Sequence, residues 1–343
     1  MQRCLDLALK GAGKVAPNPM VGAVLVHGNR VIGEGFHGQY GGPHAEVNCI
    51  KGVQTNDLPL ITDSTLYVSL EPCAHFGKTA PCTDLIIEKK IPRVVIACGD
   101  PFDKVNGKGI EKLKAAGITV ITGILEKRAI EVNKRFFTFH QKQRPYIILK
   151  WAQSNDKKIG IRDNERIFIS NGYSNRLVHR WRSEEAAIMV GTNTALHDNP
   201  SLTTRLWHGP DPLRVIIDRQ LRLPLSLRLF NDEAKTIVFN LLRQEEAGNI
   251  IYYKIDDQEE ILHRVMSVLH GLEVQSILIE GGAKLLNSFI EAGLWDETRI
   301  ITNKQLAIGN GIEAPVLKNA TLQTEAQMLT DHIAYYLNPI VNN

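Results

Sequence analysis

In the first half of the chain, short runs of apolar residues alternate with segments whose apolar positions recur at helical spacing. The runs predict strands at 21–26, 31–35, 65–70, 93–98 and 118–121, the first two joined by a hairpin turn at Gly28-Asn29. The spaced segments predict helices at 2–11, directly after His44, at 84–89 and at 108–116. Strands separated by helices predict a sheet with helices packed on it, which is an α/β fold.

The same alternation restarts after a polar segment at 141–145, which contains a proline. Further strands are predicted at 146–150, 187–190, 213–217, 236–239 and 276–279, with helices at 174–182 and 284–292. No internal repeat or low-complexity segment interrupts this pattern. We therefore predict two α/β domains, residues 1–143 and residues 144–343.

Composition narrows the class of protein. A chain of 343 residues with 43% hydrophobic and 22% charged residues is typical of a globular protein of about two domains. Its net charge of +3 gives no electrostatic case for binding nucleic acid or a membrane surface, and no apolar stretch approaches a membrane span. Five scattered cysteines and the absence of an apolar signal core favour a reducing compartment, so we expect the cytoplasm.

The most informative chemistry lies in three short motifs, His44-Ala45-Glu46, Pro72-Cys73 and Pro81-Cys82. One imidazole and two thiolates are the ligands of a catalytic zinc that keeps one coordination position for water. Glu46 is too close in sequence to His44 to be a fourth ligand but can move protons beside that water. A zinc-activated water and a carboxylate proton shuttle predict hydrolytic deamination of an amino-substituted heterocycle.

Other interpretations of these residues remain open at this point. The two cysteines could be inert buried thiols, or the zinc could be structural, with His75 as the fourth ligand. Iron could replace zinc in vitro, because the donor set does not select one metal.

The second half carries a weaker signal. The sequence at 277–282 predicts a strand that runs into Gly281-Gly282 and then a helix, which is typical of a phosphate site but also of an ordinary tight turn. No G-x-G-x-x-G motif follows a strand, so a Rossmann dinucleotide domain is not supported. Lys150, Arg182 and Arg205 form a basic set, although any one of them alone is more often a surface residue.

Several motifs resemble one family over nearly the whole chain. They comprise 17–22, 44–46, 71–82 and 100–109 in the first half, and 149–154, 192–205 and 280–282 in the second. Eight residues separate Cys73 from Cys82, whereas cytidine and tRNA adenosine deaminases usually have two. The chain resembles the bifunctional riboflavin-biosynthesis proteins, in which a pyrimidine deaminase is fused to a pyrimidine reductase. The resemblance implies a cytidine-deaminase-like α/β/α domain followed by a dihydrofolate-reductase-like α/β domain.

The resemblance also implies roles for individual residues. His44, Cys73 and Cys82 would bind Zn²⁺, and Glu46 would be the catalytic proton shuttle. Substrate contacts are implied at Asn18, His75, Lys78, Asp100, Arg182, Leu202, Arg205 and Glu280. Contacts with NADPH are implied at Ala152, Thr194, Asp198, Gly281 and Gly282. The substrate would be a phosphorylated pyrimidine and the assembly a homodimer or a higher homo-oligomer.

Three positions depart from the family's pattern: Phe102, where the family often has Asn, Lys157, which replaces a glycine, and Arg166, in a segment that usually carries Ser and Trp. The segment 309–315 also differs from the common pattern. No residue stands out as the proton donor of the reductase, for which Glu280 and a bound water are the candidates. Two other functions remain as alternatives, a zinc-dependent nucleoside or tRNA deaminase with an accessory domain and a non-catalytic zinc-stabilised binding protein.

Overall fold

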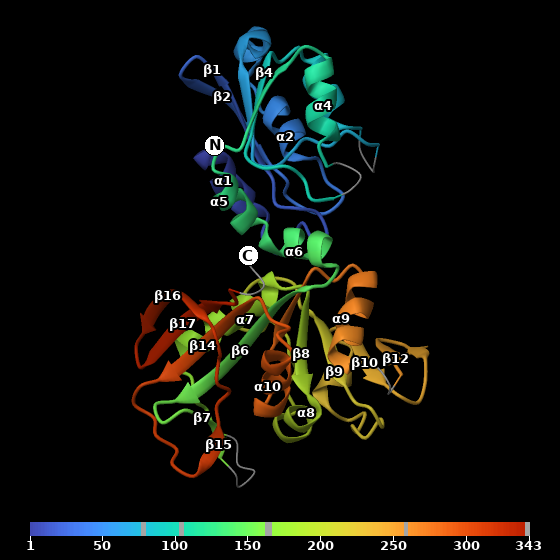
Figure 1. The fold of residues 1–343 in the computed structure, drawn as a ribbon, viewed down its shortest axis with the longest axis vertical. Coiled ribbons are helices and arrows are strands. Elements are labelled where there is room, and N and C mark those ends of the chain that lie inside the picture. Colours follow the sequence, from blue (N-terminus) through green and yellow to red (C-terminus); the bar gives the residue numbers. More distant parts are fainter. Residues whose placement is uncertain (77–79, 103–105, 162–166, 257–259, 340–343) are drawn as a thin grey trace. The chain divides into compact units, whose positions relative to one another are not determined.

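The computed structural model describes residues 1–343 apart from 77–79, 103–105, 162–166, 257–259 and 340–343 (Figure 1). The chain divides into two compact units, Met1–Gln143 and Arg144–Asn343. Each unit has its own sheet and its own buried core.

The first unit is built on a five-stranded mixed sheet in the order β2-β1-β3-β4-β5. Its strands are β1 (Gly22–His27), β2 (Arg30–Phe36), β3 (Thr65–Val68), β4 (Arg93–Ile96) and β5 (Thr119–Thr122). Its helices are α1 (Gln2–Ala8), α2 (Ala45–Lys51), α3 (Cys82–Glu88), α4 (Lys108–Ala115), α5 (Glu126–Val132) and α6 (Lys134–Lys142), with short 3-10 helices at Leu9–Gly11 and Thr55–Asp63. β1 is antiparallel to both neighbours, whereas β3, β4 and β5 are parallel.

Two glycines let helices lie directly on this sheet. A Cβ on Gly22 would come within 2.0 Å of the Cys4 carbonyl oxygen in α1, and a Cβ on Gly35 within 2.2 Å of the Cys49 nitrogen in α2. Any larger residue would push these helices off the sheet. The close approach of α2 matters for function because α2 carries Glu46 in its first turn.

The second unit is built on a ten-stranded sheet in the order β11-β12-β10-β9-β8-β13-β6-β14-β17-β16. These strands are β6 (Tyr146–Ser154), β8 (Ala187–Gly191), β9 (Leu213–Ile217), β10 (Thr236–Asn240), β11 (Glu245–Ala247), β12 (Ile250–Lys254), β13 (Ser276–Ile279), β14 (Glu297–Asn303), β16 (Thr321–Met328) and β17 (Asp331–Leu337). β7 (Lys158–Ile161) and β15 (Gly311–Glu313) form a separate two-stranded sheet. The strands from β12 to β14 run parallel, and antiparallel strands complete both edges.

Helices cover both faces of the parallel strands. They are α7 (Gly172–Glu184), α8 (Thr192–Asp198), α9 (Ile261–Gly271) and α10 (Ala283–Glu291), with a 3-10 turn at Arg228–Phe230. Along β6, Ile147 and Leu149 belong to the core shared with α9 and α10, whereas Tyr146 and Ile148 belong to the core shared with α7 and α8. Successive side chains of a strand point to opposite faces, so a strand buried on both faces is apolar throughout.

The α/β class and the strands and helices expected from the pattern are confirmed, as is the hairpin at Gly28, whose φ of +56° suits a glycine. Elements that the pattern did not predict include the helices α5, α6, α8 and α9, the strand β14, which is parallel to β6, and the antiparallel strands β16 and β17. Within the described part of the chain, no helix is long and apolar enough to cross a bilayer.

Candidate active sites

The first unit brings the three predicted metal ligands together. His44 is the N-cap of α2, Cys82 is the first residue of α3, and Cys73 lies in the segment that follows β3. The His44 Nδ1 atom lies 3.3 Å from the Cys82 Sγ atom and 3.6 Å from the Cys73 Sγ atom. The Cys82 backbone N–H donates to the Cys73 sulfur at 3.3 Å.

This donor set fits zinc. Tetrahedral zinc bonds of roughly 2.0 Å to nitrogen and roughly 2.3 Å to sulfur would place the ligand atoms roughly 3.5 Å apart. Among the described residues, His44, Cys73 and Cys82 form the group that could hold a metal ion, and His75 is not part of it. A hydrogen bond from the Cys82 thiol lowers the pKa of Cys73 to about 4 and raises that of Cys82, which favours Cys73 as the first of the two thiols to ionise.

Glu46 lies beside these ligands and is 3% exposed. Burial, reinforced by the nearby Cys73 sulfur, raises the pKa of Glu46 to about 7. Its carboxyl group can therefore hold and release a proton near neutral pH.

Asn18, an expected substrate contact, is oriented by a histidine that sequence reasoning missed. His37 is 2% exposed and its Nδ1 atom lies 3.0 Å from the Pro43 carbonyl oxygen, so Nδ1 carries the proton. The Asn18 Nδ2 group then donates to His37 Nε2 at 3.1 Å, which leaves the Asn18 carbonyl oxygen for a ligand. Burial lowers the pKa of His37, which favours this neutral form. A lone histidine just after β2 offers no motif from which this role could have been foreseen.

The other expected substrate contacts of this unit lie near the ligands. Asp100 is 8% exposed, and burial raises its pKa to about 7. The rings of His75 and Phe102 lie edge to face, with centroids 6.2 Å apart. Phe102 thus packs against His75 at a position where the family often has a polar side chain. Lys78 lies outside the described residues, as does Arg166.

In the second unit, Lys150, Arg182 and Glu280 form a buried cluster. The Arg182 guanidinium donates to both carboxylate oxygens of Glu280, at 2.8 and 2.9 Å, and the Lys150 Nζ atom lies 3.7 Å from Glu280. The three side chains are 13%, 11% and 10% exposed, respectively. Burial alone would raise the pKa of Glu280, but Arg182 and Lys150 lower it to about 2.

A second buried histidine, His179, lies near this cluster and bonds the backbone of Arg205. Its Nδ1 atom accepts the Arg205 backbone N–H at 3.0 Å, and burial, together with the charges of Arg182 and Arg205, lowers its pKa to about 4. The Arg205 guanidinium donates to the Thr203 hydroxyl at 3.2 Å. The Leu202 side chain is 2% exposed and belongs to the hydrophobic core, so Leu202 can face a substrate only through its backbone, whose φ is +56°.

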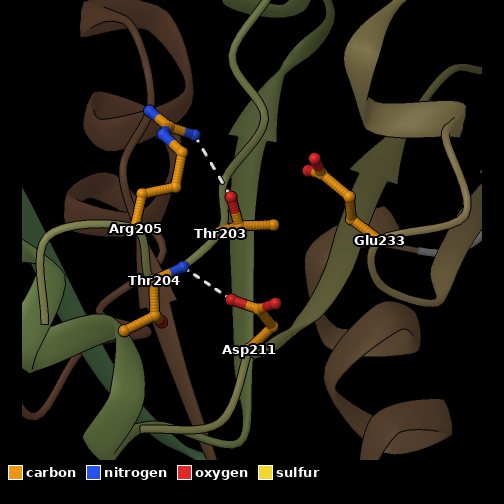
Figure 2. Close-up of a pocket in the computed structure, with 5 residues that line it drawn as sticks. All are labelled: Thr203, Thr204, Arg205, Asp211 and Glu233. Carbon is orange, nitrogen blue, oxygen red and sulfur yellow. Dashed lines mark hydrogen bonds between the residues drawn. The ribbon is translucent and has the colours of Figure 1, made fainter. Parts of the chain in front are cut away.

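Figure 2 shows the pocket next to Arg205. It has a volume of about 310 Å³ and is lined by Thr203, Thr204, Arg205, Asp211 and Glu233. The Thr204 backbone N–H donates to Asp211 at 2.6 Å, and Glu233 lies across the pocket from Arg205.

The expected cofactor residues gather at one edge of the parallel strands. Gly281 and Gly282 follow β13, Thr194 lies in the helix after the neighbouring strand β8, and Ala152 lies near the end of β6 on the other side. This edge, at the carboxyl ends of the strands, is where open α/β sheets bind ligands. The Gly282 N–H donates to the Thr194 hydroxyl at 3.0 Å, so a side chain closes this turn. Asp198 lies one helical turn beyond Thr194 and is exposed.

Comparison with known protein families gives one match in each unit. Residues 1–98 match the cytidine and deoxycytidylate deaminase zinc-binding region, and residues 145–319 match the RibD C-terminal domain. The fold and the two sites thus define a bifunctional enzyme with a zinc-binding deaminase domain and a reductase domain. The second half is a reductase domain, not an accessory domain of a nucleoside deaminase.

The chain belongs to the riboflavin biosynthesis protein RibD family. It is 38% identical to that protein of Aquifex aeolicus, over 91% of this chain and 88% of the relative. A crystal structure of the diaminohydroxyphosphoribosylaminopyrimidine deaminase/5-amino-6-(5-phosphoribosylamino)uracil reductase of Thermotoga maritima is similar to it with a TM-score of 0.89 and 34% identity, covering 98% of this chain and 97% of that one. Acinetobacter baumannii RibD gives a TM-score of 0.89 at 32% identity with the same coverage.

These matches confirm the fold and the function that the resemblance implied. The chain is an α/β protein with an N-terminal cytidine-deaminase domain and a C-terminal dihydrofolate-reductase-like domain. It functions in riboflavin biosynthesis as a pyrimidine deaminase and a reductase.

Proposed function

We propose that the first unit deaminates 2,5-diamino-6-(5-phosphoribosylamino)pyrimidin-4(3H)-one and that the second unit then uses NADPH to reduce the ribosyl group of the product to a ribityl chain. The observation that carries the proposal is the buried Glu46 carboxyl beside a three-ligand metal group. The substrate is the one named for the similar Thermotoga maritima enzyme.

In the deamination, water adds to the ring carbon and the exocyclic C–N bond breaks, which releases ammonia. His44, Cys73 and Cys82 would hold zinc, which would supply a Lewis acid that lowers the pKa of water at the site. Glu46 accepts a proton from the attacking water and delivers it to the departing amine. Asn18, His75, Lys78 and Asp100 are the proposed contacts to the substrate.

In the reduction, NADPH supplies a hydride and the enzyme must supply a proton. Glu280 is a poor proton donor because Arg182 and Lys150 hold its pKa at about 2. Lys150 suits this role better, because burial lowers its pKa and its ammonium group lies beside Glu280. We infer that Lys150 donates the proton while Glu280 fixes the positions of Lys150 and Arg182.

Substrate and cofactor contacts in the second unit are part of the same proposal. Arg182, Arg205, Glu280 and the Leu202 backbone face the substrate, and Ala152, Thr194, Asp198, Gly281 and Gly282 face NADPH. The preference for NADPH over NADH is proposed from the family resemblance. Comparing the kcat/KM values for the two cofactors tests it.

Two further features of the proposal concern the cell and the assembly. A cytoplasmic location suits a site that needs Cys73 and Cys82 reduced, and all five cysteines are free thiols. A homodimer is the assembly that the family resemblance implies, and sedimentation of the purified chain tests it.

One assay tests both activities. Purified enzyme is given the diaminopyrimidinone substrate and NADPH, and ammonia release and NADPH oxidation are followed together before and after removal of metal by a chelator. We expect ammonia release to require metal, zinc to restore it, and NADPH oxidation to begin only after deamination. NADPH oxidation before any ammonia is released would contradict the order, and metal-independent ammonia release would contradict the zinc site.

A further inference from the structure

Glu71 is a buried carboxylate that the chemistry described so far does not use. It lies two residues before Cys73, between β3 and the metal site, and is 4% exposed. Among the described residues, the hydrogen bonds that its side chain accepts come from backbone N–H groups of a distant segment, the one that follows β4. A buried carboxylate with this many donors fixes the position of the main chain that supplies them.

The hydrogen bonds reach both ends of that segment. The Glu71 Oε2 atom accepts the N–H of Asp100 at 3.3 Å and that of Gly107 at 3.0 Å. The Oε1 atom accepts the N–H of Gly109 at 2.9 Å and that of Ile110 at 3.3 Å. The Glu71 N–H in turn donates to the Cys98 carbonyl oxygen at 3.0 Å.

These contacts make Glu71 the cap of helix α4. The N-cap residue of α4 is Gly107, which has no side chain to satisfy the first N–H groups of the helix. The Glu71 carboxylate accepts hydrogen bonds from these N–H groups instead, and its negative charge suits the positive end of the helix. The two segments are also in close contact, because a Cβ on Gly109 would lie 2.1 Å from the Pro72 carbonyl oxygen.

Asp100 connects this anchor to the reaction. Its backbone is held by Glu71, and its Oδ1 atom accepts the Phe102 N–H at 2.8 Å. Its Oδ2 atom has no hydrogen bond within the described residues, so it is available to a ligand. The direction in which Oδ2 points is set by the backbone that Glu71 holds.

We propose that Glu71 is a positioning residue of the deaminase site, whose carboxylate fixes the main chain of Asp100 and the start of α4 relative to the Cys73 segment. Glu71 does not touch the substrate and acts through Asp100. This inference rests on the proposed function, in which Asp100 binds the pyrimidine substrate.

A double-mutant cycle tests it, with Glu71→Gln, Asp100→Ala and the double variant assayed for deamination. The amide of Gln places an NH₂ group against backbone N–H donors, so Glu71→Gln should raise KM about 10- to 100-fold, the cost of losing hydrogen bonds to a charged group, with a much smaller change in kcat. The double variant should be no worse than Asp100→Ala alone, because a residue that acts only through Asp100 has nothing left to position. Fully multiplicative effects would overturn the proposal.

Three controls separate positioning from a general loss of structure. Zinc content should stay at the wild-type value, because loss of zinc in Glu71→Gln would mean that Glu71 serves the metal ligands instead of Asp100. Reductase activity of the same chain should be unchanged. Glu34→Gln, which breaks the exposed pair with Arg3 in the same unit, should leave KM unchanged.

Gly109→Ala displaces the same segment through the Pro72 contact and should reproduce the rise in KM even if Glu71→Gln does not fold.

Amide hydrogen exchange gives a readout that does not depend on activity. Glu71→Gln should speed exchange in peptides covering 98–101 and the first turn of α4, while exchange in α2 stays unchanged. If the wild-type enzyme showed no deamination, the proposed function would fail, yet exchange would still decide whether Glu71 anchors this segment. Unchanged exchange at both places would overturn the proposal.

Discussion

Glu46 and Glu280 are both buried carboxylates, yet their surroundings move their pKa values in opposite directions. No cation among the described residues bonds the Glu46 carboxylate, and burial raises its pKa to about 7. Glu280 is held by Arg182 and Lys150, which lower its pKa to about 2. One side chain is therefore suited to moving a proton and the other to carrying a fixed charge.

For Glu46, we expect Glu46→Gln to lower kcat for ammonia release by about 10²- to 10⁴-fold, the usual contribution of a positioned acid–base group. The amide keeps the size of the side chain but cannot exchange the proton. Zinc content should be retained, and NADPH oxidation with the deaminated intermediate should be normal. Full deaminase activity in this variant would rule out Glu46 as the proton shuttle.

For Lys150, we expect Lys150→Met to lower NADPH oxidation about 100-fold or more while ammonia release is unaffected. Lys150→Arg keeps the charge beside Glu280, but a guanidinium does not release its proton in proteins. If proton donation is the role, the Arg variant should be as impaired as the Met variant, and Lys284→Met on the exposed side of α10 should be normal. Recovery of activity in Lys150→Arg would show that charge alone is needed.

The elements that the sequence predicted well are those buried on both faces. β6 and β13 consist of nearly continuous apolar residues, so their pattern reveals them. β14 was missed because its buried positions include Glu297 and Arg299, which satisfy each other at 2.6 Å. β16 was missed because it lies at the sheet edge with most of its residues exposed. Its apolar residues therefore show neither the helical spacing nor the alternation of a half-buried strand.

Site residues could be predicted where they belong to a short motif, and could not where their role depends on a distant segment. His44, Cys73 and Cys82 were predictable because metal ligands are rare residue types that recur in short motifs. His37, His179 and Glu71 were not, because their roles depend on backbone groups of segments distant in sequence. The diglycine after β13 was visible, but the Thr194 hydroxyl that closes its turn belongs to another helix.

At the start of α10, we expect Gly282→Ala to weaken cofactor binding. A Cβ there would lie 3.1 Å from the Thr194 hydroxyl oxygen, which must shift by a few tenths of an ångström and weaken the hydrogen bond that it accepts from residue 282. The KM for NADPH should rise about 10-fold, the cost of one such bond, with deamination unchanged. Gly271→Ala, whose Cβ meets nothing within 4 Å, is the matched control. An unchanged KM in Gly282→Ala would exclude this turn from the cofactor site.

On the scale of the whole molecule, the two units can be followed separately. All four tryptophans lie in the second unit, at positions 151, 181, 207 and 295. Three of them are buried, with exposures of 4%, 4% and 2%, so their fluorescence reports unfolding of that unit. Because the metal ligands belong to the first unit, a chelator should not shift the tryptophan-monitored transition.

The second unit should lose stability as the pH falls below about 6.5, the ordinary pKa of histidine. The pKa of His179 is lowered to about 4 in the folded chain by burial and by Arg182 and Arg205, so the unfolded chain binds more protons between these two values. Glu280, whose folded pKa is about 2, extends the loss of stability below pH 4.5. The temperature midpoint of tryptophan-monitored unfolding should therefore decrease when the pH is lowered from 7 to 5. His179→Asn, whose amide oxygen can still accept the Arg205 N–H, should flatten this dependence, and an equal slope in that variant would show that other groups cause it.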